Sequence, residues 1–198
     1  TGPWLAMARR LTDAGLHAPE IRAADAENGF VLMSDLGTRL FLPELNGETV
    51  DTLYRQALDA LLQMQTRVPS QDLPAYDEQR LSAEMELMPT WFFERHLGFT
   101  PSCGQWDVIE VAFRALLDSA GRQSQAFVHR DYHSRNLLIS ESGQPGILDF
   151  QDAVHGGIRI ALGVLGQQLV RDERAVGPAG DDIGERAAAI DPELPAGG

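Results

Sequence analysis

Hydrophobic side chains recur every three or four positions in four separate stretches of the chain, and this spacing is typical of helices with one buried face. The stretches are residues 3–14, 50–64, 78–97 and 105–120. Pro89 lies inside the third stretch, where a proline cannot donate the helical hydrogen bond. The pattern therefore predicts four helices, with the third kinked or split at Pro89.

Short apolar runs separated by turn residues predict two β-hairpins. The runs 21–24 and 30–34 flank a turn that contains Asn28 and Gly29, and an Asn-Gly pair between apolar runs favours a tight hairpin. The runs 137–139 and 146–148 flank a second turn-rich segment, and a further strand is expected at 126–128. The sequence predicts a mixture of helices and strands, which is an α+β fold class.

The composition of the last part of the chain is different. Beyond Gly157 the residues are mostly Ala, Gly, Asp, Glu, Arg and Pro, and no useful apolar periodicity remains after about residue 170. We expect 158–198 to be a divergent and partly disordered tail.

Overall composition narrows the class of protein further. The chain has 198 residues and 43% hydrophobic content, yet no apolar run approaches the roughly 20 residues of a membrane span. No secretory signal is evident and Cys103 is the single cysteine, so a cytoplasmic protein without a membrane segment is expected. The net charge of −13 repels nucleic acid. All 16 basic residues are arginine, and lysine is absent.

The stretch from His129 to Asn136 carries the strongest chemical signal, together with Asp149 at the end of the second hairpin. Antiparallel pairing brings Asp149 back beside Asn136, with Asp131 in the loop just before them. Such a set of oxygen ligands suits Mg²⁺ that also carries phosphate, and a loop carboxylate can accept a proton from a substrate hydroxyl. The pattern favours a phosphoryl-transfer site.

A purely structural role is the competing interpretation. An isolated His-x-Asp is common, and a loop aspartate often caps a turn. Here, however, matching residues stand at two separate places joined by a strand, a turn and a strand. A catalytic site, or one inherited from a catalytic ancestor, is therefore favoured.

These motifs resemble those of the protein-kinase-like phosphotransferases, and among them the aminoglycoside phosphotransferase family. The resemblance implies a protein-kinase-like fold, made mostly of the helical large lobe with one helix and a hairpin of the small lobe. It divides the chain into a partial N-terminal lobe and hinge (1–36), a catalytic lobe (37–157) and the tail. It also implies that Asp131 is the catalytic base, that Asn136 and Asp149 hold Mg²⁺, and that ATP meets the hinge at Met33, Ser34, Asp35 and Leu36.

Three segments are similar, more narrowly, to the amino-sugar kinases of this family: 128–137, 149–156 and 91–97. This resemblance implies phosphorylation of the anomeric hydroxyl of N-acetylmuramate or N-acetylglucosamine during peptidoglycan recycling. The side chains expected near the sugar are His133, Arg135, Gln151, Asp152 and Arg95.

Several of these residues also have a less specific interpretation. The aromatic run 91–93 could stack on a sugar ring, but core packing is favoured. Arg95 could pair with the lactyl carboxylate of N-acetylmuramate, although a solvated helix face is favoured. Because Mg²⁺ prefers oxygen, His133 and His155 are interpreted as positioning groups. Cys103 has no histidine nearby in sequence, so a nucleophilic role is disfavoured.

The resemblance also has limits. A kinase of this type uses a phosphate-binding loop and a strand lysine paired with a helix glutamate, and residues 1–19 offer none of these. We therefore expect an incomplete chain whose tail is foreign or read in a shifted frame.

Three hypotheses about function compete. The first is an amino-sugar kinase, and the second is a kinase of another acceptor such as an aminoglycoside, which an acidic surface would attract. The third is a non-catalytic, pseudokinase-like module. The expected partner is a small molecule, and the oligomeric state is left open.

Overall fold

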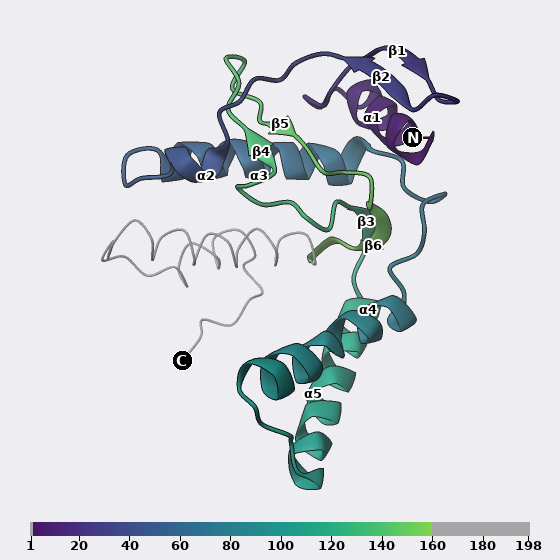
Figure 1. Cartoon of the computed structure of the whole chain (residues 1–198), viewed down its shortest axis with the longest axis vertical. Helices are drawn as coiled ribbons and strands as arrows, with labels where there is room; N and C mark the ends of the chain where they lie inside the picture. The colour runs from purple at the N-terminus through teal and green to yellow at the C-terminus, as the bar shows by residue number, and fades with distance from the viewer. Residues whose placement is uncertain (1, 160–198) are drawn as a thin grey trace.

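The computed structural model describes residues 2–159 (Figure 1). In chain order the elements are α1 (Gly2–Asp13), β1 (Ile21–Asp25), β2 (Phe30–Met33), α2 (Phe41–Glu44), α3 (Val50–Arg67), α4 (Glu78–Met85), the π-helix η1 (Met88–His96), α5 (Cys103–Gly121), β3 (Gln125–Val128), β4 (Leu137–Leu138), β5 (Gly146–Ile147) and β6 (Val154–Gly157). The expected helices and both hairpins are present. The tail expected at 158–198 lies outside the described residues, apart from residues 158 and 159.

Helix α1 and the β1–β2 hairpin lie together at one end of the molecule (Figure 1). The strands pair antiparallel, with Ile21 opposite Met33 and Asp25 opposite Phe30. Gly29 in the turn has φ of 78°, a conformation that glycine adopts without steric cost. The prediction of a hairpin from Asn28 and Gly29 is confirmed.

Helix α3 provides one side of the main core. Its buried face includes Ala57, Leu61 and Met64, which are spaced by three or four positions as the sequence pattern predicts. Phe127 from β3 and Phe150, which follows β5, are also fully buried in this core. The core therefore lies directly behind the segments that carry the candidate site.

Two short antiparallel sheets frame the loop 129–136. Strand β3 pairs with β6, so that Phe127 lies opposite His155, and β4 pairs with β5, so that Leu137 lies opposite Ile147. Strand β6 and the short helix α2 were not expected from the sequence. The segment Val154–Gly157 contains two glycines, which have low β propensity, and it becomes a strand because of its tertiary contacts.

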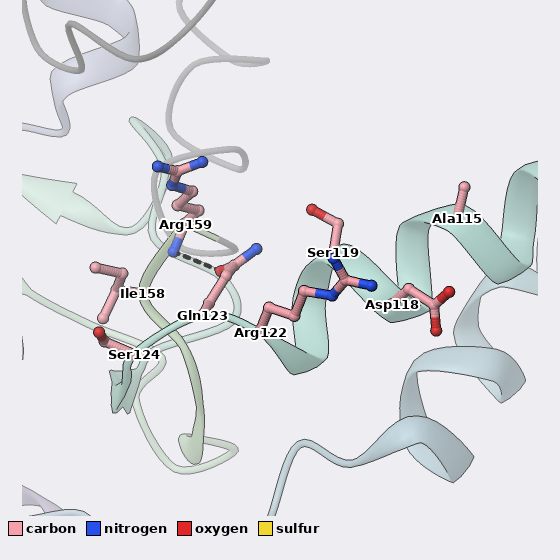
Figure 2. Close-up of a pocket in the computed structure, with 8 residues that line it drawn as sticks. All are labelled: Ala115, Asp118, Ser119, Arg122, Gln123, Ser124, Ile158 and Arg159. Carbon is pink, nitrogen blue, oxygen red and sulfur yellow. Dashed lines mark hydrogen bonds between the residues drawn. The ribbon is translucent and has the colours of Figure 1, made fainter.

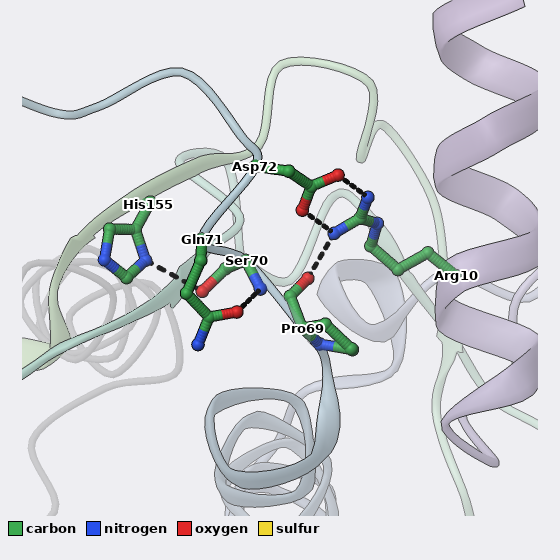
Figure 3. Close-up of polar contacts among 6 residues, drawn as sticks. All are labelled: Arg10, Pro69, Ser70, Gln71, Asp72 and His155. Carbon is green, nitrogen blue, oxygen red and sulfur yellow. Dashed lines mark hydrogen bonds and ion pairs between the residues drawn. The ribbon is translucent and has the colours of Figure 1, made fainter.

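The segment between α3 and α4 connects α1 to β6 (Figure 3). Arg10 donates to both carboxylate oxygens of Asp72, at 2.7 and 2.5 Å, and also to the carbonyl oxygen of Pro69. Ser70 Oγ lies 2.9 Å from Nδ1 of His155. The same connecting segment is thus held by α1 on one side and by β6 on the other.

Helices α4, η1 and α5 extend away from the rest of the molecule as a separate arm (Figure 1). Helix α4 ends at Met85 and η1 begins at Met88, so the predicted break near Pro89 is confirmed. Trp91 and Phe92 are 59% and 49% exposed. The interpretation of these two as core residues is therefore wrong, because η1 turns them away from the main core. No described helix is long and apolar enough to span a membrane.

Candidate active site

Buried side chains fix the loop 129–136 against the core. His129 and Tyr132 are both fully buried, and their rings meet edge to face with centroids 5.5 Å apart. The Tyr132 hydroxyl donates to the carbonyl oxygen of Ala57 at 2.8 Å. Within the loop, the backbone N–H of Asn136 donates to the carbonyl oxygen of His133 at 2.9 Å. The loop therefore has one defined conformation against α3.

The amide group of Asn136 joins the three residues expected to carry chemistry. Its Nδ2 donates to the backbone carbonyl oxygen of Asp131 at 3.0 Å and lies 3.3 Å from Oδ2 of Asp149. The backbone carbonyl of Asn136 also accepts from the N–H of Leu148 at 3.0 Å, which continues the β4–β5 pairing. The predicted convergence of Asn136 and Asp149 through the second hairpin is present in the structure.

Two non-glycine residues of this region have left-handed backbone conformations. The φ values are 74° at Arg130 and 60° at Asp149. Such conformations are unfavourable for residues with a Cβ atom, and they concentrate at functional sites where the surrounding structure enforces them. Both lie at the candidate site, one directly before Asp131 and the other at a proposed metal ligand.

The two residues that follow Asp149 hold the segment after β5 in place. Gln151 Nε2 donates to Oδ1 of Asp149 at 2.7 Å. The next residue, Phe150, is buried, and its ring centroid lies 5.4 Å from that of Trp4 in α1. Gln151, which was expected beside the sugar, is thus in direct contact with the Asp149 carboxylate.

The pKa of His129, at the start of the loop, is strongly shifted by burial. Burial lowers the pKa of His129 to about 4, while the carbonyl of Leu148 and the Asp149 carboxylate act in the opposite direction. Neither ring nitrogen has a hydrogen-bond partner among the described residues. A neutral ring is consistent with this surrounding, since an unpaired buried charge is costly.

Sequence reasoning missed one contact of this loop. Arg130 Nη2 donates to Oε1 of Glu84 at 2.6 Å, and the Tyr76 hydroxyl donates to Oε2 of the same carboxylate. Burial and the hydrogen bond to Glu84 raise the pKa of Tyr76 to about 12, so this hydroxyl remains a donor at neutral pH. Glu84 is a partly exposed residue of α4, and nothing in its local sequence marks it.

Asn136 and Asp149 are suited to Mg²⁺ by their chemistry. An amide oxygen and a carboxylate are hard oxygen ligands, and Mg²⁺ takes few protein ligands when phosphate and water supply the others. Within residues 2–159 no group of three or more His, Cys, Asp or Glu side chains could hold a metal ion alone. The donor set fits a cation that arrives with a nucleotide.

The hinge candidates lie next to the β4–β5 turn. Asp35 and Leu36 line a cleft of about 740 Å³ together with residues 139–142. The backbone N–H of Ser34 already donates to the carbonyl oxygen of Glu20 at 2.9 Å, and Met33 is part of β2. The backbone of Asp35 and Leu36 is therefore the better candidate for contact with adenine.

The remaining candidates have different surroundings. Arg95 lies in the arm, with its guanidinium 5.2 Å from the centre of the Trp91 ring. Arg135 and Asp152 are exposed. His133 Nδ1 is buried and has no hydrogen-bond partner among the described residues. Two members of the expected sugar-binding group hydrogen-bond to the Asp131, Asn136 and Asp149 set: Gln151 through its side chain to Asp149, and His133 through its backbone carbonyl to Asn136.

A second concave surface lies where α5 ends, beside β6 (Figure 2). It measures about 600 Å³, and its lining residues are Ala115, Asp118, Ser119, Arg122, Gln123, Ser124, Ile158 and Arg159. Gln123 Oε1 accepts from the backbone N–H of Arg159 at 3.0 Å. None of the predicted site residues lines this surface.

The fold, with Asn136 between the backbone carbonyl of Asp131 and the carboxylate of Asp149, is of the kind found in the protein-kinase-like phosphotransferases. Residues 2–190 match the model of the phosphotransferase enzyme family. The chain belongs to that family, and the resemblance seen in the sequence is confirmed.

Two relatives of this chain carry the same name. The chain is 45% identical over 159 residues to an N-acetylmuramate/N-acetylglucosamine kinase of Pseudomonas aeruginosa, a match that covers 79% of this chain and 46% of the relative. It is 42% identical over 156 residues to the kinase of the same name from Pseudomonas putida, with the same two coverages. The chain spans about half the length of the curated relatives it matches.

Solved structures support the fold class. An aminoglycoside phosphotransferase from Streptomyces rimosus in complex with ADP and streptomycin superposes with a TM-score of 0.62 at 11% identity, over 96% of this chain and 72% of that one. A choline/ethanolamine kinase family protein from Mesorhizobium loti gives a TM-score of 0.57 at 16% identity, over 96% and 66%. The expected protein-kinase-like fold is thereby confirmed.

Proposed function

We propose that the protein of which this chain forms part is an ATP-dependent kinase that phosphorylates the anomeric hydroxyl of N-acetylmuramate and N-acetylglucosamine. The observation that carries the proposal is the amide of Asn136, which connects Asp131 with Asp149. The names of the Pseudomonas relatives support the choice of sugar. We assign the reaction to peptidoglycan recycling in the cytoplasm.

In the proposed mechanism, Asp131 acts on the acceptor. Its carboxylate accepts a hydrogen bond from the anomeric hydroxyl and takes the proton as that oxygen attacks the γ-phosphorus of ATP. The new bond joins the sugar oxygen to phosphorus, the bond between the γ-phosphorus and the bridging oxygen breaks, and ADP leaves. Precise placement of the acceptor supplies much of the rate enhancement in this type of reaction.

Asn136 and Asp149 are assigned to Mg²⁺, with their side-chain oxygens as ligands. When bound, Mg²⁺ neutralises charge on the phosphate oxygens of the nucleotide. Gln151 donates to Asp149 and so orients its carboxylate. The backbone of Asp35 and Leu36 is assigned to adenine, with Met33 and Ser34 holding that segment to β1.

The sugar is assigned to the face of the loop that carries His133 and Arg135. The buried Nδ1 of His133 lacks a partner among the described residues, and Arg135 is exposed and able to meet a carboxylate. Asp152 and Arg95 complete the set, Arg95 from the arm. Hydrogen-bonding groups with arginine suit a neutral or anionic sugar, whereas a polyamine acceptor requires several carboxylates.

The test compares acceptors in a chimera, in which residues 1–198 are joined to the parts of the Pseudomonas aeruginosa relative that lie outside the match. ATP, Mg²⁺ and equal concentrations of N-acetylmuramate or kanamycin are supplied, and kcat/KM is compared. Preference for N-acetylmuramate supports the proposal. Preference for kanamycin would identify an aminoglycoside kinase, which the net charge of −13 would suit.

The 198-residue chain is assayed alone in parallel. Because it contains no lysine, only arginine can provide positive charge to the phosphates, and we expect poor turnover. A chimera that binds nucleotide but transfers phosphate to neither acceptor would favour the non-catalytic module.

A further inference from the structure

Glu84 of α4 is the point where the arm contacts the loop that carries Asp131. Its two carboxylate oxygens have different donors, with Arg130 Nη2 at 2.6 Å on Oε1 and the Tyr76 hydroxyl on Oε2. The guanidinium of Arg130 also lies 5.7 Å from the centre of the Tyr76 ring. The three side chains form a closed set of contacts, in which each touches the other two.

This set is more shielded from water than an ordinary surface pair. The side chains of Arg130 and Glu84 are 31% and 40% exposed, whereas those of Arg114 and Glu78, an ion pair between α5 and α4, are 67% and 66% exposed. Partial burial strengthens a charge interaction, because less water screens it. The Arg114–Glu78 pair has the same chemistry without contact to the loop, which makes it a matched control.

Tyr76 connects the set to the sheet beside the loop. Its backbone N–H donates to the carbonyl oxygen of His155 in β6 at 2.8 Å. Strand β6 in turn pairs with β3, whose last residue directly precedes His129. The carboxylate of Glu84 therefore receives one hydrogen bond from the loop itself and one from a residue fixed to the sheet that supports the loop.

The backbone of Arg130 explains why such support is needed. Its φ of 74° is unfavourable for a residue with a Cβ atom. Arg130 lies at a bend of the chain between the buried His129 and the candidate base Asp131. A left-handed arginine persists only when its surroundings enforce it, and the described polar contact of its side chain is with Glu84.

We propose that Glu84 is a positioning residue, which holds Arg130 in its left-handed conformation and thereby sets the place of Asp131 and Asn136. In this proposal the arm also acts on the catalytic loop, since a shift of α4 is transmitted to the loop through the contact between Glu84 and Arg130. This inference rests on the proposed function only in calling Asp131 the base. The contact itself is independent of the identity of the acceptor.

The first test measures the loop without any assay of turnover. Amide hydrogen exchange of residues 129–136 is compared in the 198-residue chain and in its Glu84→Gln and Glu78→Gln variants. Glu84→Gln should speed exchange at the amide of Asn136 by about tenfold, because its hydrogen bond to His133 opens more often. Exchange in the β1–β2 hairpin, and in the whole Glu78→Gln variant, should be unchanged.

The second test measures the metal site. Binding of Mn²⁺ in the presence of ADP is followed by the electron paramagnetic resonance signal of the metal, and Glu84→Gln should weaken this binding by about tenfold, as changes to residues that orient metal ligands do. Arg130→Lys keeps a positive charge opposite Glu84 but loses the guanidinium. The Mn²⁺ affinity of this variant should lie between those of the wild type and Arg130→Gln. The double variant Glu84→Gln/Arg130→Gln should bind Mn²⁺ no more weakly than either single variant, because the two residues act through one contact.

The outcomes separate the two proposals. Unchanged exchange at 129–136 in Glu84→Gln, or equal effects of Glu78→Gln, would overturn the positioning role. Additive losses in the double variant would also overturn it. If the loop opens as expected while the chimera phosphorylates no sugar, the proposed function fails and the positioning role of Glu84 stands. If Glu84→Gln melts the whole chain, the graded series at Arg130 provides the same comparison.

Discussion

The hydroxyl of Tyr132 donates a hydrogen bond of 2.8 Å to the backbone carbonyl of Ala57, a residue 75 positions earlier in the chain. Burial raises the pKa of Tyr132, so the hydroxyl remains a donor. This bond fastens the loop of Asp131 to the middle of α3. Its partner is a helical carbonyl, which also keeps its place in the α3 hydrogen-bond ladder.

Tyr132→Phe should therefore lower the free energy of unfolding by about 0.5–1.5 kcal/mol, the usual net contribution of one buried hydrogen bond. The ring stays in place and only the hydroxyl is lost, so no large cavity forms. Urea unfolding of both chains measures the difference. A stability equal to that of the wild type would mean that the bond contributes nothing net.

Asp131→Asn should reduce kcat of the chimera by about 10²–10⁴-fold with little change in KM for ATP, because the amide cannot take the proton. Asp59→Asn, on the exposed side of α3, is the matched control and should retain full activity. If Asp131→Asn kept kcat within a few-fold of the wild type, Asp131 would not be the base.

Asp149→Asn should weaken Mn²⁺ binding to the chain in the presence of ADP more than Gln151→Ala does. The first change removes the charge of a proposed ligand, whereas the second removes only the donor at 2.7 Å that orients it. For the supporting residue we expect a loss of about tenfold. Titration by electron paramagnetic resonance ranks the two variants, and the reverse order would contradict the assignment of Asp149.

Gly156→Ala should destabilise the fold far more than Gly157→Ala. A Cβ at position 156 would lie 2.7 Å from Cβ of Tyr76, which is fixed to its backbone, and such overpacking costs about 1–3 kcal/mol. A Cβ at position 157 would meet the amide oxygen of Gln123 at 2.5 Å, but that group ends a flexible side chain and can turn away. Thermal unfolding of both variants tests the contrast, and equal losses would refute it.

His129 predicts a loss of stability in mild acid. Its folded pKa of about 4 is below the unfolded value of roughly 6.5, so below pH 6.5 the unfolded chain binds the extra proton. The stability that depends on the neutral ring is therefore complete above pH 6.5 and is lost as the pH falls toward 4, by up to about 3 kcal/mol.

His129→Phe should remove this pH dependence, because the ring nitrogens have no partner among the described residues and an apolar ring fits the same surroundings. Urea unfolding between pH 4 and pH 7 compares the two chains. The prediction fails if both chains lose the same stability over this range.

Much of the fold follows from local patterns in the sequence. The α3 stripe through Ala57 and Leu61 is read correctly from its spacing, and the turn at Asn28 and Gly29 forms as expected. The convergence of Asn136 and Asp149 was also predictable, because antiparallel pairing of the two strands brings the end of the hairpin back beside its beginning.

Other features depend on contacts between distant segments. Strand β6 forms where Tyr76 packs over Gly156, and no local propensity of its sequence indicates this. Glu84 meets Arg130 across 46 positions, so its role could not be seen from either neighbourhood alone. Trp91 is exposed because η1 lies in the arm, away from the main core, whereas hydrophobicity alone predicted burial for it.

The contact between Trp4 and Phe150, with ring centroids 5.4 Å apart, gives the molecule a natural optical probe. The indole of Trp4 touches the residue next to Asp149, so any rearrangement of that segment alters the surroundings of the indole and hence its emission. The other two tryptophans, Trp91 and Trp106, lie in the arm and can be replaced by phenylalanine to remove background. Fluorescence of the remaining Trp4 would then follow cation or nucleotide binding at Asp149 in real time, without an added label.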